Sequence, residues 1–166
     1  LSTRKELQWK GVSIFYWNPA QGKIDDLALE GSDHLIHLAG ASVSNRWTAE
    51  YKKEINNSRV YTSKVLLDAM NRVQKGPKSC VSASAIGYYG SSSSKFFIEH
   101  TPPADDFLAS VTENWERYTK KFESSDRRSV QLRIGIVLDK GAGVLGKLVP
   151  LAKAGVASPL GSGKQW

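Results

Sequence analysis

The sequence predicts an α/β fold built on an open, doubly wound parallel sheet. Short apolar runs with the length of buried strands alternate with longer segments whose apolar residues recur at helical spacing, in the order strand, helix, strand, helix, strand. The first run leads into a turn of small residues and the second into a loop with two glycines, as expected where strand ends border a ligand. At 166 residues and 40% hydrophobic content, the chain is long enough for one domain with a buried core.

The first strand is expected at residues 33–38, and it runs into the tight turn Ala39-Gly40-Ala41. Thr48 is placed to cap a helix that begins at Ala49, and Gly76-Pro77 is expected to stop it. Near its end this helix has an apolar face with helical spacing, made by Val65, Leu66, Ala69, Met70 and Val73.

The second strand is expected at residues 79–85, followed by a loop rich in glycine and tyrosine at 86–90. A second amphipathic helix follows, with its apolar face at Leu108, Val111, Trp115, Tyr118 and Phe122. The third strand is expected at 130–138. We expect helices on both faces of the sheet, and one rim of strand ends that holds Ala39-Gly40, Ser82 to Ser84 and the turn Asp139-Lys140.

Composition excludes several classes of protein. The chain has no apolar stretch near the ~20 residues that cross a bilayer, and its first ten residues lack the apolar core of a signal peptide. Its one cysteine, Cys80, sits in an apolar run, which suits a buried thiol and a reducing, cytoplasmic compartment. The net charge of +7 is spread over scattered pairs of basic residues, so we expect neither nucleic acid nor membrane as a partner.

Two glycine motifs are weak. Residues 141–146 match GxGxxG, but Pro150 interrupts a following helix early and no acid follows up to Trp166. The same stretch matches GxxxxGK, but Leu148 stands where a phosphate-binding loop needs Ser or Thr. We expect a flexible glycine-rich loop bordering a pocket. His34 and His37 should point to opposite faces of a strand, so no metal site is expected there.

Several segments together resemble the epimerase family proteins, an atypical branch of the extended short-chain dehydrogenases/reductases with an NAD(P)-binding Rossmann fold. The segments are LSTRK, HLAGASVSNRW, NSR, SASAIGYYG, ENWE, LRIGIVL and GVLGKLVP with GVASPLGSGKQW. The resemblance implies that a first strand-helix unit precedes Leu1 and that a C-terminal substrate domain follows Trp166. Residues 1–166 would then be an incomplete NAD(P)-binding domain with no second domain.

The resemblance also implies an NADP site. Thr3 and Arg4 would receive the adenosine 2′-phosphate, a task that suits the planar donors of arginine. The other residues that the resemblance places by the cofactor are Leu38, Ala39, Gly40, Ser42, Arg59, Ser82 and Val111.

For catalysis the resemblance points to Ser84, with Ser82 as second choice. The Tyr and Lys of the family's YxxxK motif are missing, because Phe107 and Val111 stand at their positions. Tyr88 and Tyr89 could take over as the acid, with Lys147 as a source of charge, although glycine-flanked tyrosines are more often packing residues.

The function implied is that of an NADP(H)-dependent oxidoreductase or nucleotide-sugar-epimerase-like protein acting on a small carbonyl or alcohol. The missing YxxxK motif motivates an alternative, an NADP(H)-binding regulator or scaffold with little turnover, related to division. We expect a small-molecule substrate as the partner and allow for a homodimer.

Overall fold

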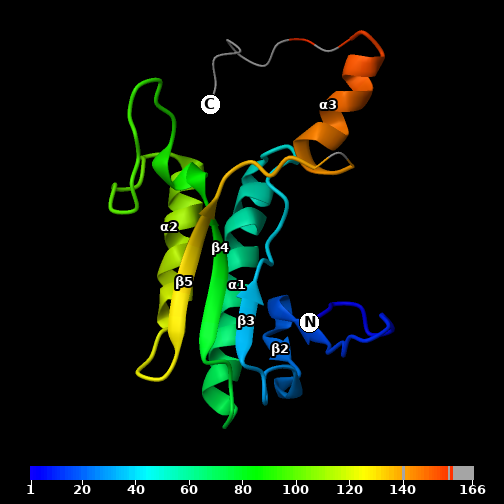
Figure 1. Cartoon of the computed structure of the whole chain (residues 1–166), viewed down its shortest axis with the longest axis vertical. Coiled ribbons are helices and arrows are strands. Elements are labelled where there is room, and N and C mark those ends of the chain that lie inside the picture. The colour runs from blue at the N-terminus through cyan, green and yellow to red at the C-terminus, as the bar shows by residue number, and fades with distance from the viewer. Residues whose placement is uncertain (140, 157, 159–166) are drawn as a thin grey trace.

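A parallel sheet of three strands forms the centre of the computed structural model, which describes residues 1–139, 141–156 and 158 (Figure 1). The strands β3 (His34–His37), β4 (Ser79–Ala85) and β5 (Arg128–Ile134) lie in the order β3-β4-β5. All of β4 pairs with β5, whereas β3 pairs only with residues 79–82. The last three residues of β4 therefore extend beyond β3 at the carboxyl edge of the sheet.

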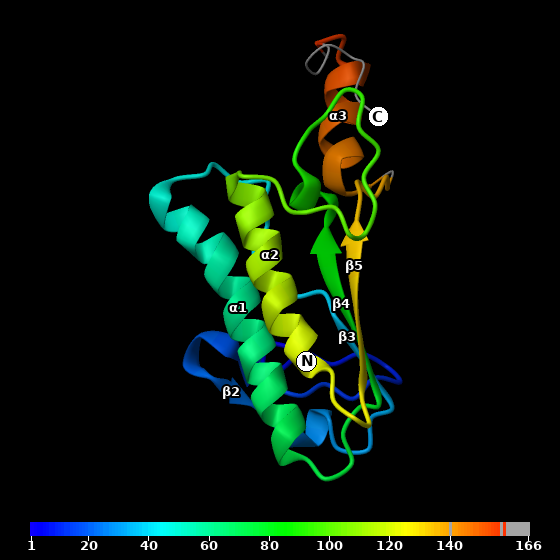
Figure 2. The same cartoon turned by 90° about the vertical axis from the view of Figure 1, so that its left-hand side faces the viewer.

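Two long helices, α1 (Ala49–Arg72) and α2 (Phe107–Thr119), lie side by side on one face of this sheet (Figure 2). Thr48 caps α1 as predicted, since its side chain accepts a hydrogen bond from the Tyr51 amide at 3.1 Å. The Asp106 side chain caps α2 in the same way through the Ala109 amide. None of the helices that the structure describes is long and apolar enough to cross a membrane.

The hydrophobic core fills the space between the helices and the sheet. It confirms the predicted face of α1 and the predicted burial of Cys80, whose thiol contacts the Met70 sulfur at 3.6 Å. Phe122, in a 3-10 turn after α2, is completely buried. The buried members of the core are Trp17, Leu29, Leu35, Leu66, Ala69, Met70, Cys80 and Phe122.

A small N-terminal unit lies beside the edge of the sheet near β3 (Figure 1). It contains the antiparallel pair β1 (Trp17–Asn18) and β2 (Lys23–Ile24), and Ser2 forms a parallel bridge to Tyr16. An ion pair of 2.6 Å between Asp26 and Arg72 joins this unit to the end of α1.

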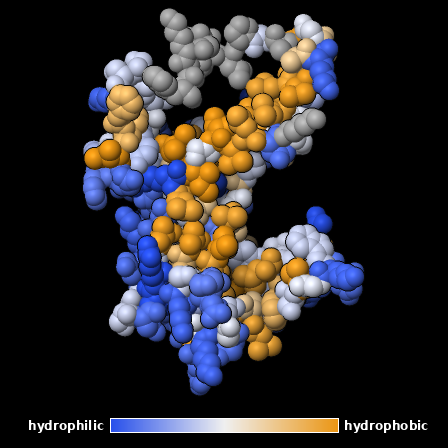
Figure 3. Space-filling view, in the orientation of Figure 1, coloured by the Kyte–Doolittle hydropathy of each residue, from blue (hydrophilic) through white to orange (hydrophobic). Residues whose placement is uncertain are grey.

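The second face of the sheet is open, which differs from the prediction of helices on both faces. Within the described residues, both long helices contact the same face (Figure 2). The opposite face carries aliphatic side chains, and Figure 3 shows this apolar surface continuing toward α3 (Gly143–Lys153). Ile36, Leu132 and Ile134 are 69%, 47% and 37% exposed on it. The parallel α/β class predicted from the sequence is confirmed.

The segment after β5 differs from its prediction in two ways. β5 ends at Ile134, so the last four residues of the predicted strand lie outside the sheet. The predicted loop over 141–147 is wrong, because α3 begins at Gly143 and passes through Pro150. Leu145, Lys147 and Leu148 favour a helix, and Pro150 removes only one intrahelical donor from it.

Candidate functional site

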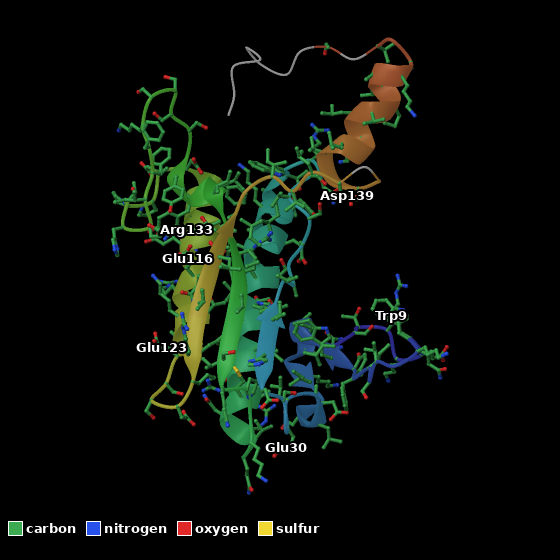
Figure 4. The ribbon with its side chains drawn as sticks, in the orientation of Figure 1. Trp9, Glu30, Glu116, Glu123, Arg133 and Asp139 are labelled. Atoms are coloured by element: carbon green, nitrogen blue, oxygen red, sulfur yellow. The ribbon has the colours of Figure 1, made fainter. Side chains whose placement is uncertain are left out.

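A buried hydrogen-bonded network lies between the carboxyl halves of β4 and β5 and the helix α2 (Figure 4). The Ser84 hydroxyl, 3% exposed, donates to Oε1 of Glu116 at 2.7 Å. Arg133 of β5 donates to the same carboxylate through two of its guanidinium nitrogen atoms. Its Nε donates to Oε1 at 2.7 Å, and its Nη2 donates to Oε2 at 2.9 Å. Such a fork fixes the guanidinium in both position and orientation.

Tyr88 and Tyr89 join this network through the other end of the guanidinium. Nη1 of Arg133 donates to the Tyr89 hydroxyl at 2.8 Å and to the Glu99 carbonyl at 2.9 Å. The Tyr88 ring stacks on the guanidinium, with its centroid 3.6 Å from the central carbon of Arg133. The structure thus brings together three sequence-predicted residues, Ser84, Tyr88 and Tyr89.

The two charged groups of the network, Glu116 and Arg133, neutralise each other. Burial opposes the charged form of Glu116, but the hydrogen bonds from Arg133 and Ser84 leave the pKa of its carboxyl below the usual value. The same carboxylate is the main reason that the pKa of Arg133 is raised. Both groups therefore stay charged at neutral pH.

A cavity of about 490 Å³ opens beside Tyr89. Its lining combines aromatic residues and prolines with the polar side chains of Ser91, Ser92, Lys95 and Thr101. The lining includes Tyr89, Lys95, Phe96, Phe97, Thr101 and Pro102. The Phe97 ring stacks on Tyr89 with 5.1 Å between ring centroids, so the phenol forms part of the cavity wall.

The turn after β3 is held by Arg59 from α1. Nη1 of Arg59 donates to the carbonyls of Ala41 and Ile55 at 3.1 and 2.8 Å, and its guanidinium lies 4.9 Å from the Trp115 ring. Burial lowers the pKa of Arg59. A Cβ on Gly40 would lie 3.1 Å from the Arg59 side chain, so glycine allows this close approach.

The remaining predicted rim residues are not gathered around one point. Ser42 is exposed and bonds to the Ser44 hydroxyl at 2.8 Å, and Leu38 is exposed next to Ala39. Ser82 and Val111 are buried, and the Ser82 hydroxyl donates to the Ala83 carbonyl at 3.1 Å. Their roles toward a cofactor stay predictions. Lys140 and the terminal GSGKQW lie outside the described residues.

Thr3 and Arg4 lie in the N-terminal unit, apart from the network. Both are exposed, and Arg4 lines an open cavity of about 440 Å³ with Lys5, Glu6 and Leu7. Figure 4 shows Trp9 of this unit on the opposite side of the sheet from Arg133 and Glu116. The predicted phosphate end and the predicted catalytic end are therefore separate regions.

Sequence reasoning missed Glu116 and Arg133. The available signal was Arg133 itself, a charged residue inside the apolar run VQLRIGIVL, since a charge inside a strand needs a partner. Glu116 follows Trp115 in the second helix, and it is not one of the apolar positions of the helical pattern. Its burial is explained by Arg133 rather than by periodicity.

His37 is a second buried polar residue, on the helix-covered face of β3. Its Nε2 lies 3.3 Å from the Ser63 hydroxyl and 3.4 Å from the Thr62 hydroxyl, between the rings of Trp115 and Phe122. Burial, with the nearby charge of Arg59, lowers the pKa of His37 to about 4. His34 is exposed on the other face, as strand periodicity predicts.

Comparison with known proteins identifies relatives of this chain. It is 39% identical over 140 residues to the chloroplastic epimerase family protein SDR39U1 homolog of Arabidopsis thaliana, which covers 83% of this chain and 40% of that protein. It is 34% identical over 166 residues to an epimerase family protein of Staphylococcus aureus, covering 99% of this chain and 55% of the relative. The chain thus spans about half the length of these relatives. No family model matches.

Comparison with solved structures also identifies epimerase proteins as similar to this chain. Human epimerase family protein SDR39U1, crystallised with NADPH, superposes with a TM-score of 0.76 at 30% identity, over 82% of this chain and 48% of that one. A nucleoside-diphosphate sugar epimerase of Corynebacterium glutamicum gives 0.71 at 28% identity, over 89% and 30%. With its parallel sheet and these relatives, the chain belongs to the epimerase family that includes SDR39U1.

Proposed function

We propose that this protein is an NADP(H)-dependent oxidoreductase or epimerase-like protein that acts on a small carbonyl or alcohol compound. The observation that carries the proposal is the convergence of Ser84, Tyr88 and Tyr89 on the ion pair of Glu116 and Arg133, at the strand ends where open α/β sheets bind ligands. The likeness to a human structure solved with NADPH supports the choice of cofactor.

The chemistry of the N-terminal unit fits the phosphorylated end of NADP. Arg4 and Lys5 line one cavity, and neither takes part in an ion pair within the described part of the chain. Arginine and lysine side chains without a carboxylate partner are suitable donors for a 2′-phosphate. Arg4, with Thr3 and Lys5 beside it, would hold that phosphate.

The protein's own residues would bind and orient the reactants. NADPH, when bound, supplies a hydride to the carbonyl carbon of the substrate. Tyr89, beside Arg133, supplies a hydroxyl group next to a cavity lined in part by aromatic rings, where a carbonyl compound can bind. We also keep the cytoplasm as the proposed compartment, in line with the buried free thiol of Cys80.

A titration of NADPH and NADH into the protein tests the cofactor. We expect tighter binding of NADPH, and Arg4→Ala should weaken NADPH by roughly 1.5 to 3 kcal/mol while leaving NADH nearly unchanged, because only NADPH loses a charge-assisted contact. Arg128→Ala is the matched control, since Arg128 is an exposed arginine at the amino end of β5. Equal loss of both cofactors in Arg4→Ala would contradict the 2′-phosphate assignment.

A second candidate function is an NADP(H)-binding regulator with little turnover. It is favoured by Phe107 and Val111 at the positions of the family's Tyr and Lys, since neither side chain can transfer a proton and Val111 is buried. A screen of carbonyl substrates with NADPH separates the two functions. Tight NADPH binding with no turnover of any ketone or aldehyde supports the regulator.

A further inference from the structure

The geometry points to Tyr89 as the proton donor to the substrate carbonyl, with Arg133 as the cation that supports it and Glu116 as the residue that positions Arg133. This inference rests on the proposed function, and it replaces the earlier choice between Tyr88 and Tyr89 by one assignment. It also gives a role to Glu116 and Arg133, which stand in the segments ENWE and LRIGIVL but were assigned no role by the family resemblance.

The direction of the hydrogen bond between Arg133 and Tyr89 is fixed by chemistry. A guanidinium can only donate, so in the 2.8 Å contact the phenol oxygen of Tyr89 must accept. The phenol's own proton then remains for another acceptor, and the described residues offer it none in the hydrogen bonds observed. A carbonyl oxygen in the adjoining cavity would be such an acceptor.

Arg133 is held firmly enough to act in this way. Nε and Nη2 are engaged by the two oxygens of Glu116, and both protons of Nη1 go to Tyr89 and the Glu99 carbonyl. Only 16% of the Arg133 side chain is exposed. When Tyr89 gives up its proton, the phenolate left behind lies against a fixed positive charge, which stabilises it.

Tyr88 has a different relation to the same guanidinium. It presents its ring face, 3.6 Å from the central carbon of Arg133, and its hydroxyl is not bonded to that group. A stacked ring stabilises the cation whether or not it carries a hydroxyl. Tyr88→Phe keeps this ring contact and removes only the hydroxyl, so comparing it with Tyr89→Phe tells which of the two tyrosines donates the proton.

The cavity indicates the class of substrate. Its lining includes the stacked rings of Tyr89 and Phe97, so it suits a carbonyl compound with a flat apolar body, such as an aryl ketone. In the reduction, the carbonyl carbon gains the hydride from NADPH, which becomes NADP⁺. The O–H bond of Tyr89 breaks, its proton bonds to the carbonyl oxygen, and the product is the alcohol. A proton taken up from the solvent then restores the Tyr89 hydroxyl, so the reduction consumes one proton in all.

The test measures the hydrogen bond directly with acetophenone as the probe. The infrared carbonyl band of acetophenone is recorded with the wild-type protein, with and without NADP⁺. We expect the carbonyl band of bound acetophenone at a lower frequency than that of free acetophenone in the same buffer, as for a ketone that accepts a hydrogen bond from the protein. The shifted band should be lost in Tyr89→Phe and kept in Tyr88→Phe, and Arg133→Lys, which keeps the charge, should retain part of it.

A kinetic measurement follows in the same variants. Tyr89→Phe should lower kcat for acetophenone reduction by roughly 100- to 10,000-fold with little change in KM, as for loss of a general acid. Absence of a shifted band in wild type, or its survival in Tyr89→Phe, overturns the inference. The titration with NADPH is independent of the infrared band. If the protein binds NADPH but shows no shifted band, only this inference fails. If the protein does not bind NADPH, the proposed function itself fails.

Discussion

The face of the sheet covered by α1 and α2 carries many polar side chains, whereas the open face is lined with aliphatic ones. On the covered face Ser82, Ser84 and His37 are at most 3% exposed. On the open face Ile36 and Leu132 are 69% and 47% exposed. Within one strand, the polar His37 is thus buried and the apolar Ile36 next to it is exposed. This is the reverse of what the polarity of the two side chains alone predicts.

The difference teaches that burial in this protein does not simply follow hydrophobicity. The polar groups on the covered face are tolerated because each has a partner, as in the bonds from Ser84 and Arg133 to Glu116. Stability should therefore depend strongly on small polar changes on the covered face and weakly on large apolar changes on the open one. Three predictions test this contrast, from the largest effect to the smallest.

Glu116→Gln should lower the free energy of unfolding by about 3 to 5 kcal/mol. The substitution nearly preserves shape, but it leaves the guanidinium of Arg133 largely buried without a counter-charge. Urea unfolding followed by circular dichroism measures the loss. Glu113→Gln is the control, because Glu113 is exposed on the same helix and should change stability by less than about 0.5 kcal/mol. Equal stability of the two variants would show that the ion pair is dispensable.

Acid should destabilise the protein through His37. The folded pKa of about 4 lies below the ordinary 6.5, so the unfolded chain takes up the proton first as pH falls. Stability contributed by the neutral imidazole is complete above pH 6.5 and is lost progressively down to about pH 4. At about 1.4 kcal/mol per pKa unit, this gap amounts to about 3 kcal/mol.

The measurement is the free energy of unfolding against pH for wild type and His37→Gln. The difference between the two curves removes the titration of the carboxylates, and it should change between pH 6.5 and 4. His34→Gln, on the exposed face of the same strand, should follow the wild-type curve. A His37→Gln curve parallel to wild type would mean that the imidazole is protonated equally easily in both states.

Ile36→Thr should change stability by less than about 0.5 kcal/mol, because the side chain is mostly exposed and threonine suits a strand. Leu35→Ala, one residue earlier on the covered face, should cost about 2 to 5 kcal/mol. Thermal unfolding of both variants compares the faces within one strand. A large loss in Ile36→Thr would mean that the open face is covered in solution.

Much of the fold was predictable because local patterns agree with the tertiary structure. The predicted β4 has the observed bounds, and Thr48 caps α1 as expected. The buried residues of α1 follow the predicted spacing, since amphipathic packing dominates helices of this length. Predicted and observed ends differ mainly at β5, where strand-forming residues continue past Ile134 without a neighbouring strand to pair with.

The candidate site was only partly predictable. Ser84, Tyr88 and Tyr89 were found through their local motif, but their partners Glu116 and Arg133 lie far along the chain, 32 residues beyond Ser84 and 44 residues beyond Tyr89. Glu116 was missed because it lies outside the apolar positions of its helix, and periodicity cannot reveal a charge buried by a partner from another element. The helix α3 was missed because the glycines and the proline of this segment indicated a loop, although its leucines favour a helix.

The lone thiol of the core provides a built-in reporter of conformational opening. Cys80 is 1% exposed, and burial raises the pKa of its thiol, so a thiol reagent cannot reach a reactive thiolate while the helices cover the sheet. Its rate of labelling relative to the denatured chain therefore measures how often α1 separates from β4, without any engineered probe.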